Sequence, residues 1–302
     1  MKEANLSAQS AWEEVYRIYW VFTQRCNDFC AHCYNDSGPN GKTLSAEEIS
    51  RIVSNLPDRL YRIILSGGEP FAERKKLTSL LKELREKYGK TLHISVQTNG
   101  DLLRDQDFDE IILPFVNQIS IASLDRFHKQ QGMHQERLAV LFERFGLIPK
   151  AAGTSEHLTY SFFGANEEYW LGGNWYRGRA AINQLALMDP NHNFCALRSG
   201  AKNFLARGEE TQEITIQLYE VHPCCPGTKK ALGDAREKRI SSLLERAAKI
   251  PLWQALHRGE PAEMGFNQGL SLKYANARIE DLGNVCRWCD EFFANHNKDG
   301  EK

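Results

Sequence analysis

At 302 residues, 42% of them apolar, the chain is long enough to bury a core in one large domain with a smaller appendage. Its formal net charge of −1 excludes the strong basic field of a nucleic-acid-binding or membrane-surface protein. No apolar run reaches the length of a membrane span, and residues 1–14 lack the apolar core of a signal peptide. We therefore expect the eight cysteines to be metal ligands in a reducing cytoplasm, not disulfides.

Strands and helices alternate over the first part of the chain. The run YRIYWVFT at 16–23 is rich in β-forming residues and predicts the first strand. Ser45 and Glu48 form a capping-box signature at a helix start. Further strands are expected at 61–65, 92–98, 116–122 and 158–163, and further helices at 74–88, 106–113 and 134–145. Such βα units predict the α/β class and a parallel sheet that closes as a partial or complete barrel.

The pattern changes after about residue 189. A hairpin is expected at 203–218, with helices at 240–249 and 252–257. The strands of this part are too few to hold a core alone, so we expect a metal cluster to stabilise it. The predicted domains are therefore residues 1–188 and residues 189–302.

Cys26, Cys30 and Cys33 directly follow the first predicted strand. Each thiolate can hold one iron, so three can hold three corners of a [4Fe–4S] cube and leave the fourth iron open to a ligand. A structural site normally closes all its positions. Half of a structural zinc site is the alternative reading. Its only local fourth ligand is His32, which lies between two of the cysteines and could hardly turn toward a metal that they share.

This C-x3-C-x2-C spacing, with an aromatic ring before the last cysteine, resembles the radical S-adenosylmethionine (SAM) superfamily. The resemblance implies a (β/α)6 partial barrel over about residues 15–185, with an open iron that chelates the amino and carboxylate groups of SAM. It also implies reductive cleavage of SAM to a 5′-deoxyadenosyl radical, which takes a hydrogen from the substrate. His32 matches the ring that lies against the adenine.

A second motif, Ser66-Gly67-Gly68-Glu69-Pro70, follows the second predicted strand. Read alone, it is an ordinary βα turn, whose glycines let the backbone approach a ligand closely. By resemblance it is the SAM-binding GGEP motif, whose backbone and glutamate meet the methionine amino group. Gly67, Gly68, Glu69 and Pro70 are therefore expected at the cofactor.

The next two predicted strands also end in candidate contacts. Asn99 is part of either a simple Asn-Gly turn or, by resemblance, a contact to the ribose or methionine part of SAM. Ser123 is expected to contact SAM because many family members carry Ser-x-Asp-Gly and then histidine at this place. Asp125 and His128 fit the same pattern less well, since Arg126 replaces the glycine.

Five cysteines lie in the second part: Cys195, Cys224, Cys225, Cys286 and Cys289. They resemble those of the twitch domain, the short form of the SPASM extension, which carries one auxiliary [4Fe–4S] cluster. The resemblance implies that four of them are ligands. Cys224 follows proline, as the family ligand usually does, which leaves Cys225 spare. Four thiolates also suit zinc.

The run NWYRGRA at 174–180 joins the two parts, and Gly-Arg-Ala recurs there in SPASM-bearing enzymes. Its two arginines and two aromatic rings either line a pocket for an anionic or planar group or pack the joint. We favour the second interpretation, in which the segment packs between the two parts of the chain.

The leading hypothesis is a radical SAM enzyme whose auxiliary cluster takes up the electron left on the substrate, so that the substrate is dehydrogenated or gains a bond. Relatives of this kind act on small metabolites or on peptides. A small molecule is favoured because no peptide-recognition domain is expected before the barrel, and a peptide or sulfatase maturase is the alternative. A low-potential cluster requires a flavodoxin or ferredoxin donor. A rival of another class is a non-catalytic iron–sulfur or zinc protein that transfers electrons or binds a partner. The sequence identifies no catalytic acid or base.

Overall fold

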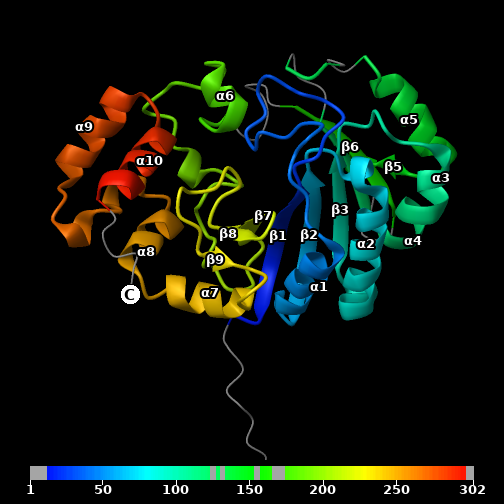
Figure 1. The fold of residues 1–302 in the computed structure, drawn as a ribbon, viewed down its shortest axis with the longest axis horizontal. Coiled ribbons are helices and arrows are strands. Elements are labelled where there is room, and N and C mark those ends of the chain that lie inside the picture. Colours follow the sequence, from blue (N-terminus) through cyan, green and yellow to red (C-terminus); the bar gives the residue numbers. More distant parts are fainter. Residues whose placement is uncertain (1–11, 123–126, 130–132, 153–156, 165–173, 297–302) are drawn as a thin grey trace, which may run out of the picture.

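The computed structural model describes residues 12–122, 127–129, 133–152, 157–164 and 174–296. Figure 1 shows strands at the centre, with α1 to α5 around one half of them and α7 to α10 beside the other. The strands are β1 (Glu14–Thr23), β2 (Arg59–Gly67), β3 (His93–Thr98), β4 (Gln118–Ala122), β5 (Ile148–Pro149), β6 (Thr159–Phe163), β7 (Glu213–Gln217), β8 (Glu220–His222) and β9 (Gly233–Asp234).

Ten α-helices are found among the described residues. They are α1 (Ala46–Asn55), α2 (Arg74–Tyr88), α3 (Asp105–Asp107), α4 (Leu113–Phe115), α5 (Gln135–Arg144), α6 (Gly178–Ile182), α7 (Ile240–Ala247), α8 (Pro251–Arg258), α9 (Leu272–Leu282) and α10 (Val285–Asn295). The short helices are η1 (Pro70–Glu73), η2 (Gly89–Thr91), the π-helical η3 (Phe108–Ile112), η4 (Lys150–Ala152), η5 (Phe194–Ala196), η6 (Pro261–Glu263) and η7 (Phe266–Gln268). Within the described part of the chain, no helix combines the length and the apolar character that a membrane span needs.

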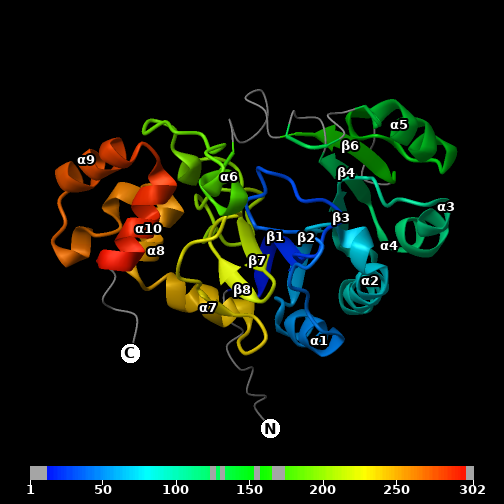
Figure 2. The same cartoon turned by 45° about the horizontal axis from the view of Figure 1, so that its top comes forward.

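The described strands form one sheet in the order β5-β6-β4-β3-β2-β1-β7-β8-β9. Pairing is parallel from β5 to β7, and β8 and β9 are antiparallel additions. The α/β parallel fold expected from the alternating pattern is thus confirmed. The chain leaves each parallel strand at the same edge of the sheet, where Figure 2 shows the loop after β1. That edge is where a ligand of such a sheet binds.

Sequence patterns predict the first part well. The helix expected at 74–88 is α2, and Ser45 and Glu48 form the predicted capping box at α1, with their side chains each accepting the other's backbone N–H at 3.2 and 2.9 Å. The helix expected at 106–113 is broken into α3, η3 and α4.

The hairpin expected at 203–218 is wrong in its extent. Residues 203–212 form turns, and the hairpin consists of β7 and β8 around Leu218. The reason is tertiary: β7 pairs in parallel with β1 along its whole length, so its position is fixed by the sheet and not by a local turn. The second part therefore extends the sheet of the first.

The two faces of this sheet differ in chemistry. Alternate strand residues, among them Ile18, Ile63 and Ile94, are fully buried on the face that the helices cover. The residues between them are largely polar, and on β1 these include Arg17 and Tyr19. The concave side of the partial barrel is thus a polar interior, which suits a site and not a hydrophobic core.

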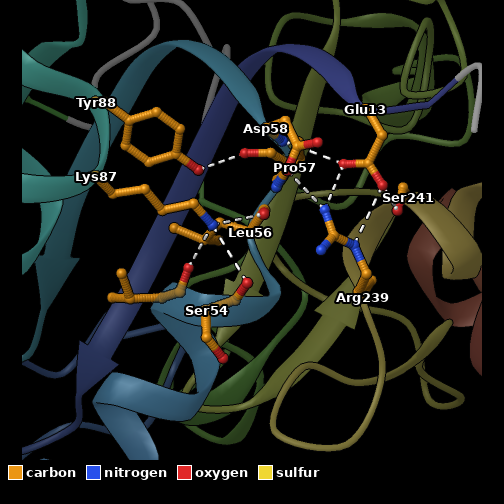
Figure 3. A network of polar contacts seen from close by, with 10 residues as sticks. Glu13, Ser54, Leu56, Pro57, Asp58, Lys87, Tyr88, Arg239 and Ser241 are labelled. Carbon is orange, nitrogen blue, oxygen red and sulfur yellow. Dashed lines mark hydrogen bonds and ion pairs between the residues drawn. The ribbon is translucent and has the colours of Figure 1, made fainter. Parts of the chain in front are cut away.

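A polar network connects the second part of the chain to the residues that precede β1 and β2, at the edge of the sheet opposite the pocket (Figure 3). Arg239, just before α7, donates to Glu13 and Asp58 at 2.8 Å each. Ser241 also donates to Glu13, at 2.6 Å. These bonds join α7 to the start of β1 and to the loop before β2.

The same network closes the end of α1 (Figure 3). Lys87 of α2 donates to the carbonyl oxygens of Val53 and Leu56 at 2.8 and 2.9 Å. Tyr88 donates to the carbonyl of Pro57 at 2.5 Å. The last carbonyls of a helix have no partner within it, so these side chains satisfy them and hold α1 against α2.

Candidate metal and cofactor site

Cys26, Cys30 and Cys33 lie in the loop after β1, and all three free thiols line one pocket. Two of the sulfurs accept backbone N–H groups: Asp28 N–H donates to Cys26 Sγ at 3.4 Å, and Ser37 N–H donates to Cys33 Sγ at 3.3 Å. No three His, Cys, Asp or Glu side chains of the described residues converge as ligands of one metal ion. Ligands of an iron–sulfur cube bind separate irons and need not converge on one point.

Burial governs the protonation of these thiols. It raises the pKa of Cys26 to about 12, and together with the carboxylate of Asp28 it raises the pKa of Cys30. Cys26 and Cys30 are therefore protonated in the bare chain, and a metal that binds them must displace their protons. Three thiols on one pocket wall, two with N–H groups directed at sulfur, fit a cube with three protein ligands.

Gly67 and Gly68 bring the end of β2 against this loop. Gly68 N–H donates to the Thr23 carbonyl at 2.7 Å. A Cβ at Gly68 would lie 2.4 Å from the Arg25 carbonyl oxygen and 2.8 Å from Cys26 Cβ. Both glycines line the pocket, as expected, but the close contacts come from Thr23 at the end of β1 for Gly67 and from the cysteine loop for Gly68.

Glu69 is fully buried and joins the ends of two strands. Its Oε1 accepts from Phe71 N–H at 2.9 Å and from the Thr98 hydroxyl at 2.7 Å, and its Oε2 accepts from Asn99 N–H at 2.8 Å. Burial raises its pKa to about 7. Asn99 lines the pocket, but Glu69 and Pro70 are not among the described residues that line it. Glu69 thus positions Asn99, and its contact to SAM stays a prediction.

His32 also lines the pocket. Its ring stacks on Phe127, with centroids 5.3 Å apart, and His128 lies edge-on to it at 4.6 Å. His128 also lines the pocket. Ser123 and Asp125 lie outside the described residues, so their predicted roles have no structural description.

The GRA segment lies at the joint, as favoured from the sequence. Arg179 donates to the Cys30 carbonyl at 2.8 Å and pairs with Asp36 at 2.8 Å. Its guanidinium lies over the Phe29 ring, 3.7 Å from the centroid. Gly178 has φ +50°, and a Cβ there would lie 2.5 Å from the carbonyl oxygen of Cys33. This segment therefore holds the cysteine loop in place. Arg179 also lines the pocket, so the two readings of this motif are not exclusive.

Arg177 reaches the other way, toward the second group of cysteines. It pairs with Asp290 at 3.0 Å and donates to the Gly227 carbonyl at 3.1 Å. Burial would lower its pKa, but Cys286 and Asp290 raise it. A buried guanidinium thus stands beside the predicted auxiliary ligands.

Four cysteines from three distant segments influence one another's pKa there, although no three of them converge on one metal position: Cys195 of η5, Cys224 after β8, and Cys286 and Cys289 of α10. The last two are three residues apart on one helix, so they share a face. Burial raises the pKa of Cys195, and the other three thiols raise it further, as expected for neighbours.

Cys225 faces elsewhere. Its Sγ lies 3.5 Å from the Tyr34 hydroxyl, and its pKa is raised chiefly by burial. Cys224 and Cys225 lie in the bend and turn after β8, and the contact of Cys225 with Tyr34 separates its environment from that of Cys224.

Comparison with known proteins bears on the first part of the chain. The sequence pattern of the Radical SAM superfamily matches residues 20–141. These residues form a radical SAM domain. Over 121 residues the chain is 32% identical to a probable GTP 3′,8-cyclase of Methanococcus vannielii, a match that covers 39% of each protein. Over 111 residues it is 31% identical to the antilisterial bacteriocin subtilosin biosynthesis protein AlbA of Bacillus subtilis, covering 36% of this chain and 24% of AlbA. The matches thus span well under two thirds of these relatives' length.

The likeness to a solved structure reaches into the second part as well. The crystal structure of BtrN in complex with AdoMet and 2-DOIA is 16% identical, with a TM-score of 0.52. It covers 82% of this chain and 89% of BtrN. At this identity the likeness concerns the fold, and it agrees with the partial barrel.

Sequence reasoning missed part of the pocket wall of the radical SAM domain. Tyr19 donates to Ser66 Oγ at 2.8 Å and to Gln97 Oε1 at 3.3 Å, and all three residues line the pocket. Tyr34 also lines it, and forms a hydrogen bond with Tyr19. The available signal was polar residues at alternate positions inside buried strands. Through Tyr34, this wall reaches Cys225 and so the second cysteine group.

Proposed function

We propose that the chain is a radical SAM enzyme, with a [4Fe–4S] cluster on Cys26, Cys30 and Cys33. The observation that carries this proposal is one pocket lined by these three thiols and by the ends of β1, β2 and β3. When bound, the cluster and SAM supply a 5′-deoxyadenosyl radical on reduction. Three protein thiolates leave one iron for SAM, which a closed metal site would not do.

The residues around the thiols would orient SAM. The backbone of Gly67 and Gly68 and the amide of Asn99 offer polar groups at the ends of the strands, and His32 offers a ring for the adenine. Ser123 and the Glu69–Pro70 turn remain candidates from the family resemblance. The loop bonds of Arg179 keep the thiols in place, so that loading the metal does not require ordering the loop.

The auxiliary [4Fe–4S] cluster is proposed on Cys195, Cys224, Cys286 and Cys289. Their mutual electrostatic influence and common burial support this set, and Arg177 beside them offsets part of the negative charge that four thiolates bring. Cys225 is left out because its sulfur faces Tyr34. The predicted domains, 1–188 and 189–302, would each carry one cluster.

A closed auxiliary cluster favours an oxidation, because it can accept an electron but cannot bind the substrate. We therefore propose a dehydrogenation or a bond formation, on a small molecule that enters beside SAM. A peptide is the alternative, since AlbA is named for bacteriocin biosynthesis. Flavodoxin or ferredoxin in the cytoplasm would supply the electron that starts the reaction.

The test is formation of 5′-deoxyadenosine from SAM after anaerobic reconstitution and reduction, together with metal analysis. We expect 5′-deoxyadenosine and about eight irons per chain, four for each cube. A protein that holds iron but releases no 5′-deoxyadenosine would be an electron carrier. Four irons with one zinc would remove the auxiliary cluster, and with it the case for an oxidation.

A further inference from the structure

A charged row crosses the polar interior of the sheet below the pocket. The register places Glu213 beside Arg17, Arg17 beside Arg62, and Arg62 beside His93, on four neighbouring parallel strands. Cross-strand partners point to the same face, and so do residues two apart on one strand. Arg17 therefore shares the face of Tyr19, which lines the pocket.

The row is not neutral. Arg17 pairs with Glu213 at 3.1 Å, and each of the two side chains is only 7% exposed. Arg62, directly beside Arg17, meets only neutral partners in its hydrogen bonds: it donates to Ser95 Oγ at 3.2 Å and to Gln118 Oε1 at 2.9 Å. Like charges directly opposite each other on a sheet are destabilising.

Two further cations face this row. Burial, Arg17 and Arg198 together lower the pKa of Arg62 to about 10. Burial and three cations, Arg62 first, lower the pKa of Lys150. Arg198 and Lys150 are exposed, so the uncompensated charge of the interior is that of Arg62, and an anion beside it would offset that charge.

The hydrogen bonds of the row are also incomplete. The buried Nε atoms of Arg17 and Arg62 have no hydrogen-bond partner among the described residues, and neither has Oε1 of Glu213. A buried polar group without a partner costs about 1–3 kcal/mol. The hydrogen bonds within the row thus leave two guanidinium Nε–H groups, one each of Arg17 and Arg62, for a group that enters the barrel.

We propose that this row binds an anionic oxygen group of the substrate, a carboxylate or a phosphate. A guanidinium presents two parallel N–H groups that match either one. The row lies two residues below Tyr19, or about 7 Å along the strand at ~3.3 Å per residue. Ile64 is the register partner of Tyr19, and Ser120 and Ser161 are level with Gln97 at the pocket. A substrate held at its anionic end would thus present its other end to the SAM pocket.

This inference rests on the proposed function, because it assumes that the substrate enters the SAM pocket. It narrows the substrate class to anionic metabolites, or to a peptide that carries a carboxylate at this distance from the reacting atom. It also assigns a purpose to Arg62, whose hydrogen bonds go to the neutral side chains of Ser95 and Gln118.

The test uses iron-loaded protein and isothermal titration with inorganic phosphate and with succinate at low ionic strength, where charge is least screened. We expect saturable binding of at least one of them, and a loss of about tenfold or more in Arg62→Met or Arg17→Met, since about 1.4 kcal/mol corresponds to tenfold. Arg62→Lys, which keeps the charge but not the fork, should fall between. The matched control is Arg59→Met on the same strand, whose side chain is 76% exposed and whose binding should equal the parent's.

Thermal unfolding separates a binding role from a structural one. Removing one of two adjacent cations should leave Arg62→Met as stable as the parent or more so. A lower unfolding temperature in Arg62→Met, equal binding in that variant, or no binding of either anion by the parent would each overturn the proposal. 5′-Deoxyadenosine formation is measured on the same preparations. Its absence in a parent that binds the anion would refute the radical SAM activity and leave the anion site standing.

Discussion

The two groups of cysteines differ in what their sulfurs face. Cys26, Cys30 and Cys33 come from one short loop and open onto a pocket. The other four come from η5, the turn after β8, and α10; three of them are buried and Cys224 is half-buried, and Cys224, Cys286 and Cys289 influence the guanidinium of Arg177 electrostatically. Openness, and not the number of thiols alone, distinguishes a centre that can take a ligand from one that can only pass electrons.

The largest expected effect is on the open group. Changing Cys26, Cys30 or Cys33 to Ala removes one of three iron ligands, so each variant should release no 5′-deoxyadenosine while keeping about half of the iron. Product and iron are measured on the same anaerobic sample. A variant that cleaves SAM at the parent rate would show that its cysteine is not a ligand.

The closed group offers an internal control, because two adjacent cysteines differ in orientation. Cys224→Ala should lose about half of the iron and destabilise the second part, whose segments the proposed auxiliary cluster would join. Cys225→Ala should keep all of it, since that sulfur faces Tyr34. Iron analysis of the two variants tests which cysteine is the ligand. If Cys225→Ala lost iron and Cys224→Ala kept it, Cys225 would be the ligand.

The joint between the groups is tested at Gly178. Gly178→Ala should cost about 2–5 kcal/mol in free energy of unfolding, because a left-handed backbone is strained and the new Cβ meets the Cys33 carbonyl. Gly146→Ala is the control: its φ is +78°, but nothing lies within 4 Å of its Cβ, so only the strain of about 1 kcal/mol applies. Urea unfolding measures both. Equal costs would show that the close contact is not rigid.

A smaller effect is expected of pH on the free energy of unfolding, through Glu69 near the first group of cysteines. The pKa of Glu69 is raised to about 7 in the folded chain, so the folded state holds the proton more tightly than the unfolded state. Its contribution to stability is therefore complete below about pH 4.5 and is lost as the pH rises through 7. Glu69→Gln should flatten the pH dependence of the unfolding free energy between pH 5 and 7. An unchanged slope in this variant would show that Glu69 does not titrate in this range.

The open group could be predicted from the sequence because its residues are local: the cysteine spacing, the glycines after β2 and the strand–helix alternation all lie in short windows. The polar interior face of the sheet could not be predicted from the sequence. Arg17 and Arg62 are 45 positions apart and become neighbours only through the register of β1 and β2. The α10 helix was also missed, although Val285, Trp288 and Phe292 follow a helical period, because its cysteines were read only as a metal motif.

The pairing of β7 with β1 makes the second part a structural need of the first. From Arg17 to Val21, β1 is interior only because β7 covers its outer side. A chain cut between residues 188 and 189 would leave this long, largely apolar strand with unpaired N–H and C=O groups, a template for joining other chains. Such a fragment should aggregate, however well its own cluster assembles. Residues 189–302 are thus not a detachable module, because they contain β7, which completes the sheet of the first part.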